Sequence, residues 1–230
     1  MTLQTAGASG LRFDKIDKRY GGIYALRQVS LEIELGECVA LAGRNGSGKT
    51  TLLRVAAKLV RPSAGAFHFT GVAKQRPSTG YVGHASMVYD ELTAEENLIL
   101  FARLQNVDKP ESRVESLLNA TGLLDRRDSL VRTFSRGMRQ RMALSRALLA
   151  EPTVLFLDEP ATGLDTVGVN WLANTLRSLR HAGCTILMSL HGESEISSLA
   201  TRAIRLESGC VAADTRAGAP MNSIFALSNG

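Results

Sequence analysis

Alternating apolar and polar side chains near the start of the chain predict strands. The segments 11–20 (LRFDKIDKRY) and 29–35 (VSLEIEL) alternate in this way, as a sheet with one solvated face requires. The next run, 38–43 (CVALAG), is apolar and leads through a glycine-rich loop into the helical pattern 50–60 (TTLLRVAAKLV). This helix should stop near Pro62, and 66–70 (AFHFT) resembles a further strand.

The middle of the chain changes to a helical period, which is followed by strands and helices in alternation. Helical segments are predicted around 93–104, 111–119 and 136–149. Strand-like 153–158 (TVLFLD), helical 169–180 (VNWLANTLRSLR) and strand-like 185–190 (TILMSL) come next. Near-continuous apolar strands that alternate with helices predict an α/β fold, in which a parallel sheet is covered on both faces.

Composition narrows the protein class only a little. With 230 residues and 44% hydrophobic side chains, the chain can form one sizeable core. Its net charge of +5 suits nucleotides, nucleic acid or an anionic membrane surface equally well. Cys38, Cys184 and Cys210 lack the spacing of a metal site and are expected as free thiols in a reducing compartment. We find no secretory signal and no apolar run of about 18 residues, so the expected location is cytoplasmic.

The most specific motif is GRNGSGKT, from Gly43 to Thr50, which matches G-x-x-x-x-G-K-[ST]. A strand precedes it and a helix follows, as a phosphate-binding loop requires. Glycines allow the backbone N–H groups to turn toward phosphate oxygens, and the helix N-terminus adds its dipole. Lys49 should reach the β- and γ-phosphates, and Thr50 should place its hydroxyl on Mg²⁺.

Two carboxylates follow the apolar strand TVLFLD. Asp158 and Glu159 emerge where that strand ends, and ligands of open α/β sheets bind at that edge. Beside a phosphate-bound Mg²⁺, Asp158 can serve the metal, and Glu159 can orient or deprotonate an attacking water. Taken alone, the pair would be better interpreted as an acidic loop after a strand, for example a helix cap; the Lys49 loop beside it favours the metal and water roles.

A second helix start could also bind phosphate. Ser135 is placed to cap a helix that begins near Arg136, and Gly137 leaves that helix start open to close approach. One nucleotide cannot readily occupy this site and the Lys49 loop on a single chain. The pair of sites therefore suggests a second subunit.

These motifs, in this order, resemble the nucleotide-binding subunit of an ATP-binding-cassette (ABC) transporter over nearly the whole chain. Gly43–Thr50 resembles the family's Walker A loop, and the strand ending in Asp158 and Glu159 resembles its Walker B strand. The segment 134–139 (FSRGMR) resembles the LSGGQ signature but departs from it at Phe134, at Arg136 and after the retained Gly137. ATGLD resembles the D-loop, and Tyr20 matches the aromatic that stacks on adenine, with Tyr24 as the alternative.

His84 stands where family members usually carry a glutamine, three residues after a tyrosine like Tyr81. A neutral imidazole can accept a hydrogen bond from a metal-bound water, and its charge titrates near neutral pH. Two interpretations stay open here: a working role at the metal, or a residue that only fills the position. This loop, with the SRGM form of the signature, is similar to the ATP-binding subunit of the haem exporter of cytochrome c biogenesis.

The resemblance implies a P-loop NTPase fold with a mainly parallel sheet, an N-terminal antiparallel β subdomain and a helical subdomain. A single ABC ATPase domain would span residues 1–215, with a helical insert at about 85–150 and a tail, 216–230, that is partly disordered. ATP and Mg²⁺ are the implied cofactors. The implied nucleotide-binding residues are Tyr20, Gly43, Arg44, Asn45, Gly46, Ser47, Gly48, Lys49, Thr50, Thr51, His84, Ser135, Gly137 and Asp165. The implied catalytic residues are Glu159 and His191, and the implied metal-binding residues are Thr50, Asp158 and His84.

The implied activity is ATP hydrolysis coupled to export. Two subunits would pair head to tail and drive a membrane permease from the inner face of the cell membrane, without contact to nucleic acid. The cargo could be haem, or the drug, lipid or polysaccharide of another small bacterial exporter. The rival from a different class is a soluble, non-transport ABC ATPase that acts on DNA or ribosomes; this chain lacks the long coiled coil or the tandem duplication of such proteins.

Overall fold

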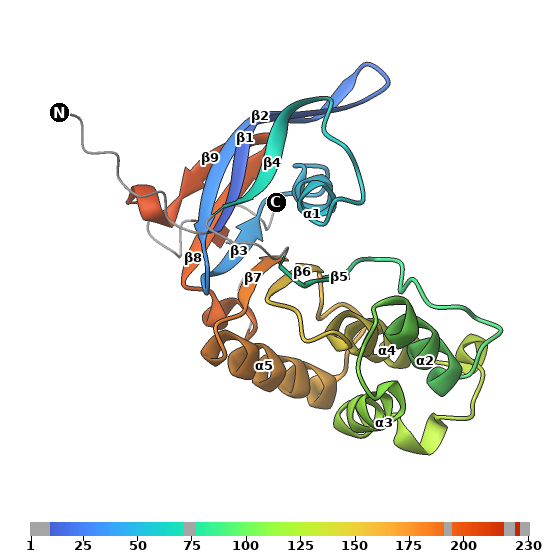
Figure 1. Ribbon diagram of the computed structural model, residues 1–230. Coiled ribbons are helices and arrows are strands. Elements are labelled where there is room, and N and C mark those ends of the chain that lie inside the picture. The colour runs from blue at the N-terminus through green and yellow to red at the C-terminus, as the bar shows by residue number, and fades with distance from the viewer. Residues whose placement is uncertain (1–9, 71–76, 191–194, 219–223, 226–230) are drawn as a thin grey trace.

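Two sheets and a lobe of helices make up the computed structural model, which describes residues 10–70, 77–190, 195–218 and 224–225 (Figure 1). A three-stranded antiparallel sheet has the order β2-β1-β4, and a six-stranded sheet has the order β5-β6-β7-β3-β8-β9. In the larger sheet all neighbours run parallel except β9, which is antiparallel to β8. The strands are β1 (Gly10–Tyr20), β2 (Ile23–Glu34), β3 (Cys38–Ala42), β4 (Ala64–Thr70), β5 (Thr79–Val82), β6 (Val154–Asp158), β7 (Thr185–Ser189), β8 (Arg202–Glu207) and β9 (Cys210–Asp214). The predicted α/β class, with its mainly parallel sheet and its N-terminal antiparallel sheet, is confirmed.

The central strands are buried on both faces, as their apolar sequences predict. Every residue of β3, β6 and β7 is buried. Along β3, Cys38 and Ala40 belong to the core shared with α5 and the helical lobe, whereas Val39 and Leu41 face the core shared with α1 and the small sheet. Alternate side chains of one strand thus enter two different cores.

In the described part of the chain, five α-helices accompany the two sheets. Helix α1 lies between the two sheets, α5 covers the opposite face of the large sheet, and α2, α3 and α4 form a separate lobe (Figure 1). Their bounds are α1 (Lys49–Ala56), α2 (Ala94–Leu104), α3 (Pro110–Ala120), α4 (Arg136–Leu148) and α5 (Thr166–His181). Single 3₁₀ turns occur at Leu124–Arg126, Val131–Thr133, Ser197–Leu199 and Thr215–Ala217. Within the described ranges, none of these helices is both long and apolar enough to cross a membrane.

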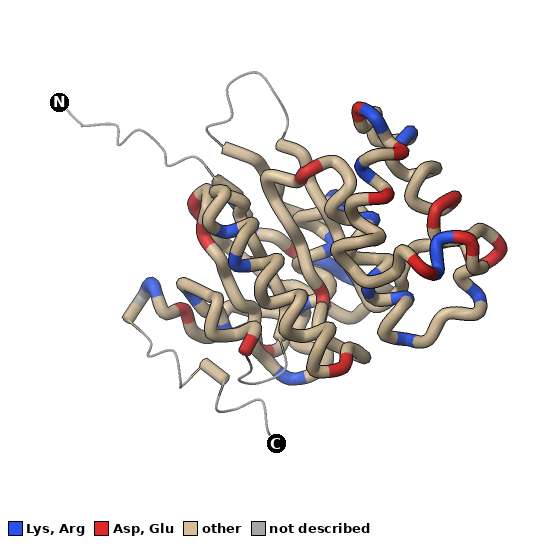
Figure 2. Tube along the Cα trace, turned by 90° about the horizontal axis from the view of Figure 1, so that it is seen from below, with Lys and Arg blue, Asp and Glu red and all other residues tan. Residues whose placement is uncertain are grey.

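A helix cap and ion pairs on the surface add to the packing of the helical lobe. Thr93 and Glu96 form a reciprocal cap at the start of α2, since each side chain accepts a hydrogen bond from the other residue's backbone N–H. Basic and acidic residues alternate along the lobe (Figure 2). One such pair, Glu95 and Arg127, ties α2 to the chain that follows α3, at 2.5 Å.

Two features of the fold differ from the sequence prediction. Helix α1 ends at Ala56, ahead of the predicted stop near Pro62, because Lys58 adopts a left-handed φ of +58° that no α-helix can continue. Strands β5, β8 and β9 were not predicted from the sequence. At the end of the chain, Ile224 and Phe225 are buried in the core; most of the predicted tail lies outside the described residues.

The three cysteines are free thiols, as predicted. Cys38 and Cys184 are buried, and burial raises the pKa of the first thiol to about 12 and of the second to about 11. A thiol needs to ionise to attack or bind metal, so both are unreactive packing residues.

Candidate functional site

The loop between β3 and α1 needs its glycines. Gly43, Gly46 and Gly48 have φ values of +139°, +79° and +108°. A Cβ on Gly43 would lie 2.3 Å from the Leu206 carbonyl oxygen, and one on Gly48 would lie 2.6 Å from the Ala25 carbonyl oxygen. The tight, backbone-lined turn predicted from GRNGSGKT is therefore the one that forms.

Lys49 is held inside this loop. Its ammonium donates to the Gly43 carbonyl oxygen at 2.6 Å and to the Arg44 carbonyl oxygen at 3.1 Å. Burial lowers the pKa of Lys49, and the nearby carboxylates Glu159 and Asp158 act in the opposite direction. Among the described residues, the hydrogen-bond partners of this ammonium are neutral carbonyl oxygens. A buried cation of this kind favours an anionic ligand, because a nearby opposite charge offsets the cost of burying the charged form.

Asp158 forms the centre of a small polar cluster at the carboxyl ends of β6 and β7. Its Oδ1 accepts hydrogen bonds from the Thr50 hydroxyl at 3.1 Å and from the Ser189 hydroxyl at 2.7 Å. The Ser189 oxygen in turn accepts from the Glu159 backbone N–H at 2.9 Å. Ser189 therefore orients the carboxylate of Asp158, the predicted metal ligand, and fixes the backbone of Glu159, the predicted catalytic residue.

The surroundings of the second carboxylate oxygen of Asp158 indicate whether the site fits Mg²⁺. The side chain is 1% exposed, and in the described part of the chain its Oδ2 is buried without a hydrogen-bond partner. An unsatisfied buried acceptor costs about 1–3 kcal/mol, which a bound cation would offset. Carboxylate and hydroxyl oxygens are the ligands that Mg²⁺ prefers, so Asp158 and Thr50 fit this ion.

Glu159 follows at the end of β6 in a strained conformation. Its φ is +52°, and the left-handed region costs about 1–2 kcal/mol for a residue with a Cβ. Its carboxylate is 15% exposed and lies 3.9 Å from Nε2 of His84, which leaves the end of β5. Chain segments far apart in sequence thus bring a carboxylate and an imidazole together.

A pocket of about 430 Å³ joins these elements. Lys49, Thr50, His84 and Glu159 line it, together with Tyr20, which is 48% exposed. The same pocket is lined by further residues predicted to bind the nucleotide: Asn45, Gly46, Ser47, Gly48 and Thr51. Gly43 and Arg44 line an adjoining pocket on the other side of the loop.

The two tyrosines proposed for the adenine lie in different surroundings. Tyr20 lines the pocket, with the Lys18 ammonium 4.9 Å from its ring centre. Tyr24 lies between the guanidinium groups of Arg19 and Arg27, 4.2 and 4.7 Å from its ring centre, and does not line the pocket. The structure therefore favours Tyr20, because its exposed ring leaves a face free for stacking.

The signature and D-loop residues lie together, away from the pocket. Ser135 caps α4 by accepting from the Met138 N–H at 3.3 Å, and a Cβ on Gly137 would lie 3.0 Å from the Gly163 carbonyl oxygen. Asp165 caps α5 by accepting from the Gly168 N–H at 2.9 Å, a bond that lowers the pKa of Asp165, as does Arg141 at 3.0 Å. None of the three predicted residues lines the pocket around Lys49.

The segment that carries His84 is anchored by residues that the sequence did not single out. Arg146 of α4 donates to the Tyr81 carbonyl oxygen at 2.8 Å, and its guanidinium lies 5.4 Å from the ring centre of Phe101 on α2. Burial lowers the pKa of Arg146. A Cβ on Gly83 would lie 2.5 Å from the Tyr81 hydroxyl, so the tyrosine ring covers the chain just before His84.

His191 lies outside the described residues, and its predicted catalytic role stays a prediction. The sequence analysis did not identify Ser189 and Arg146 as residues of the site. The signal for Ser189 is its place at the end of an apolar parallel strand, next to the strand that ends in Asp158. A phosphate loop beside such a carboxylate pair defines the class of P-loop nucleotide hydrolases.

Comparison with known proteins identifies the family. The model of the ABC transporter family matches residues 26–162. The chain is 39% identical to the ABC transporter ATP-binding protein NatA of Bacillus subtilis, over 81% of this chain and 80% of that protein. It is 36% identical to the daunorubicin resistance ATP-binding protein DrrA3 of Streptomyces coeruleorubidus, over 90% of this chain and 68% of that protein. The chain belongs to the ABC transporter family.

Solved structures share the fold. The ATP-binding subunit of an ABC transporter superposes with a TM-score of 0.84 at 27% identity, over 96% of this chain and 100% of that one. The dimeric cassette MJ0796 bound to ADP and Pi gives 0.81 at 25% identity, over 89% and 97% of the two chains. The predicted ATP-binding subunit with ATPase activity and with ATP and Mg²⁺ as cofactors is confirmed.

Proposed function

We propose that this ATPase works as a head-to-tail dimer that drives a membrane permease for export. The observation that carries the dimer is the separation of the two phosphate sites. Lys49 and Glu159 line one pocket, whereas the exposed helix start at Ser135 and Gly137 lies outside it. A second copy would bring its Ser135 helix start against the open side of this pocket.

The chain's own residues divide the chemistry as follows. Lys49 and the N-terminus of α1 bind phosphate. Thr50 and Asp158 would hold Mg²⁺, and the bound ion would supply positive charge that stabilises the phosphoryl group during transfer. Ser189 holds the Asp158 carboxylate in place. Glu159 orients the attacking water and accepts its proton.

A mixed-dimer experiment tests the composite site. All chains carry Glu159→Gln, so that bound ATP is retained rather than turned over. A Lys49→Ala chain and a Gly137→Asp chain each form homodimers with two defective sites. Their heterodimer contains one site with an intact Lys49 loop and an intact Gly137 helix start, and it should retain ATP.

The control pairs the Lys49→Ala chain with a chain that carries both Lys49→Ala and Gly137→Asp, because no intact site can form in that mixture. The readout is nucleotide retained after gel filtration, with heterodimers verified by two different tags. Heterodimers that form and retain no more ATP than the control would rule out the head-to-tail site.

The permease would dock beside the His84 segment. Met87 and Tyr89 follow His84 and are 44% and 55% exposed, and the Tyr89 ring stacks on Phe101 of α2 at 6.0 Å. Exposed apolar side chains next to a pocket favour a protein contact. Docking there would place the ATPase at the inner face of the cell membrane and would connect the permease to His84 directly.

Export is supported by the drug-resistance relative and by the Nod factor export ATP-binding protein I of Burkholderia orbicola, 35% identical over 86% of this chain. The sulfate/thiosulfate import ATP-binding protein CysA of Chlorella vulgaris is 38% identical over 85% of the chain, so direction needs its own test. Haem stays a proposed cargo, which rests on the His84 loop and the SRGM form alone.

Reconstitution of the ATPase with its co-purifying permease in proteoliposomes distinguishes these possibilities. Uptake of haem or daunorubicin into vesicles whose ATPase faces outward, on addition of external MgATP, would establish export and its cargo. ATP-dependent release of preloaded sulfate from the same vesicles would show import.

A further inference from the structure

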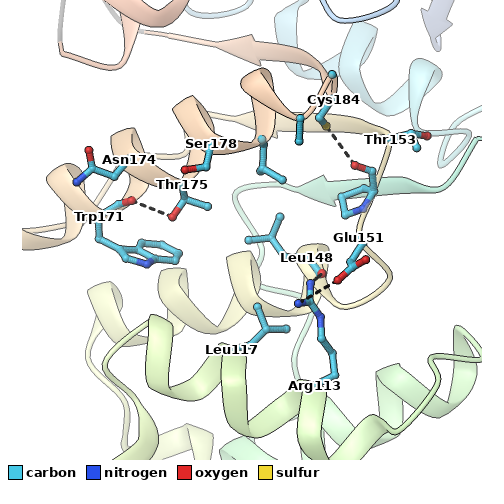
Figure 3. A pocket seen from close by; sticks show the side chains of 14 residues that line it. Arg113, Leu117, Leu148, Glu151, Thr153, Trp171, Asn174, Thr175, Ser178 and Cys184 are labelled. Atoms are coloured by element: carbon cyan, nitrogen blue, oxygen red, sulfur yellow. Dashed lines mark hydrogen bonds and ion pairs between the residues drawn. The ribbon is translucent and has the colours of Figure 1, made fainter.

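A pocket larger than the nucleotide pocket lies on the opposite side of the molecule, between the helical lobe and the core. Its volume is about 610 Å³, within the range of about 300–1,000 Å³ typical of small-molecule sites. Helix α5 forms one wall, and α3 with the end of α4 forms the other (Figure 3). Most of the lining is apolar and includes the side chains of Leu117, Leu148, Trp171, Leu179 and Cys184.

Polar groups occur on both sides of this apolar lining. Asn174 and Ser178 of α5 are exposed at the edge of the pocket. On the opposite side, Arg113 donates to the Leu148 carbonyl oxygen at 2.7 Å and pairs with Glu151 at 3.3 Å (Figure 3). Because the two charged residues neutralise each other, the pocket favours an uncharged ligand with hydrogen-bonding groups.

Trp171 determines the kind of apolar group. It lies on α5, is partly buried against the core, and lines the pocket. Aromatic rings pack against each other by offset stacking or edge-to-face contact, which adds about 0.5–1.5 kcal/mol to the burial of apolar area. A flat aromatic molecule therefore suits this wall better than a flexible chain.

The pocket is connected to the ATP interface through the two helices that line it. Helix α4 is capped by Ser135 and reaches the pocket with its last residue, Leu148. Helix α5 is capped by Asp165 and reaches the pocket from Trp171 onward. The ion pair between Arg141 and Asp165 joins the two helices near the interface. A ligand wedged between α4 and α5 would change the relative position of the two helix starts.

We propose that this pocket binds an uncharged aromatic small molecule of drug size and that binding changes ATP hydrolysis by shifting α4 against α5. Occupancy of the site requires neither the permease nor the exported compound. The test of this proposal therefore does not depend on the direction of transport.

Trp171 provides the assay, because it is the single tryptophan of the chain. The probe is 4-nitrobenzyl alcohol, which is aromatic, is uncharged at neutral pH, carries one hydroxyl and does not itself fluoresce. Titration of the full chain with this probe should give a saturable change of Trp171 emission. Under the same conditions the MgATP turnover should change about fivefold or more, the lower end of ordinary allosteric coupling.

Two variants block the pocket from exposed positions of α5 and its end. Ser178→Phe and Ala182→Phe each place a ring in the pocket without touching the nucleotide site, and both should abolish the saturable change. Asn170→Phe adds the same ring at an exposed position of α5 that does not line the pocket, and this control variant should bind like the natural chain. Thermal unfolding identifies any variant that fails to fold. If one blocking variant does not fold, the other is used to test whether the pocket binds the probe.

An emission change that does not saturate, or that persists in a folded blocking variant, overturns the site. Saturable binding that leaves ATP turnover unchanged overturns the regulatory role. Loss of both the emission change and the turnover effect in the blocking variants, with both retained in Asn170→Phe, supports the proposal.

Discussion

Ser189→Ala removes a hydroxyl that makes two hydrogen bonds at the centre of the site. The hydroxyl donates to Asp158 Oδ1 at 2.7 Å and accepts from the Glu159 N–H at 2.9 Å, and Ser189 is fully buried. A hydrogen bond to a charged group contributes about 1.5–3 kcal/mol. At about 1.4 kcal/mol for each factor of ten, its loss corresponds to roughly tenfold to a hundredfold. Loss of a partner that orients a metal ligand has effects of about the same size.

We therefore expect the variant to need about tenfold to a hundredfold more Mg²⁺ for half-maximal ATP hydrolysis, or to lose that factor in kcat. The assay is a Mg²⁺ titration at saturating ATP. Ser145→Ala is the matched control, since Ser145 is equally buried and donates to the Arg141 carbonyl oxygen at 3.0 Å, within α4. It should lower thermal stability and leave the Mg²⁺ dependence unchanged. Equal Mg²⁺ curves for the two variants would refute the assigned role of Ser189.

Four further predictions follow from the same geometry. Glu159→Gln should bind MgATP, hydrolyse it very slowly and accumulate an ATP-bound dimer in gel filtration; normal steady-state turnover would exclude the carboxylate from catalysis. His84→Gln should keep much of the isolated ATPase activity but change kcat, because it replaces the imidazole that lies 3.9 Å from the Glu159 carboxylate; an unchanged kcat would leave His84 as a residue that only fills the position. Arg146→Lys should keep ATP affinity but lower kcat, because the shorter cation cannot both donate to the backbone and pack on the aromatic ring; an unchanged ratio of kcat to KM would contradict this. Burial raises the pKa of Asp214, but its hydrogen bonds with Arg202 and Arg216 lower it more, so the net effect is a lowering. The contribution of Asp214 to stability is therefore present at neutral pH and is lost as the pH falls below about 4. Asp214→Asn should make the thermal unfolding midpoint depend less steeply on pH over that acidic range, and an unchanged slope would argue against this role.

The sequence alone was sufficient for the elements that depend on local chemistry. GRNGSGKT predicts the phosphate loop because only glycine tolerates the left-handed backbone and close contacts found at Gly43 and Gly48. The near-continuous apolar strands predict a parallel sheet, and its carboxyl edge explains why Lys49 and Asp158 meet. The reciprocal cap of Thr93 and Glu96 follows from their spacing alone.

Tertiary structure decided what depends on contacts between distant segments. Nothing near His84 in the sequence places it 3.9 Å from Glu159; that distance arises because β5 pairs with β6 in a particular register. Ser189 became a site residue only when β7 lay beside β6. Helix α1 stopped early because Lys58 took a left-handed turn that helix periodicity does not encode. Periodicity reports which side of an element is buried, whereas these contacts depend on which elements become neighbours, and that is settled by packing of the whole chain.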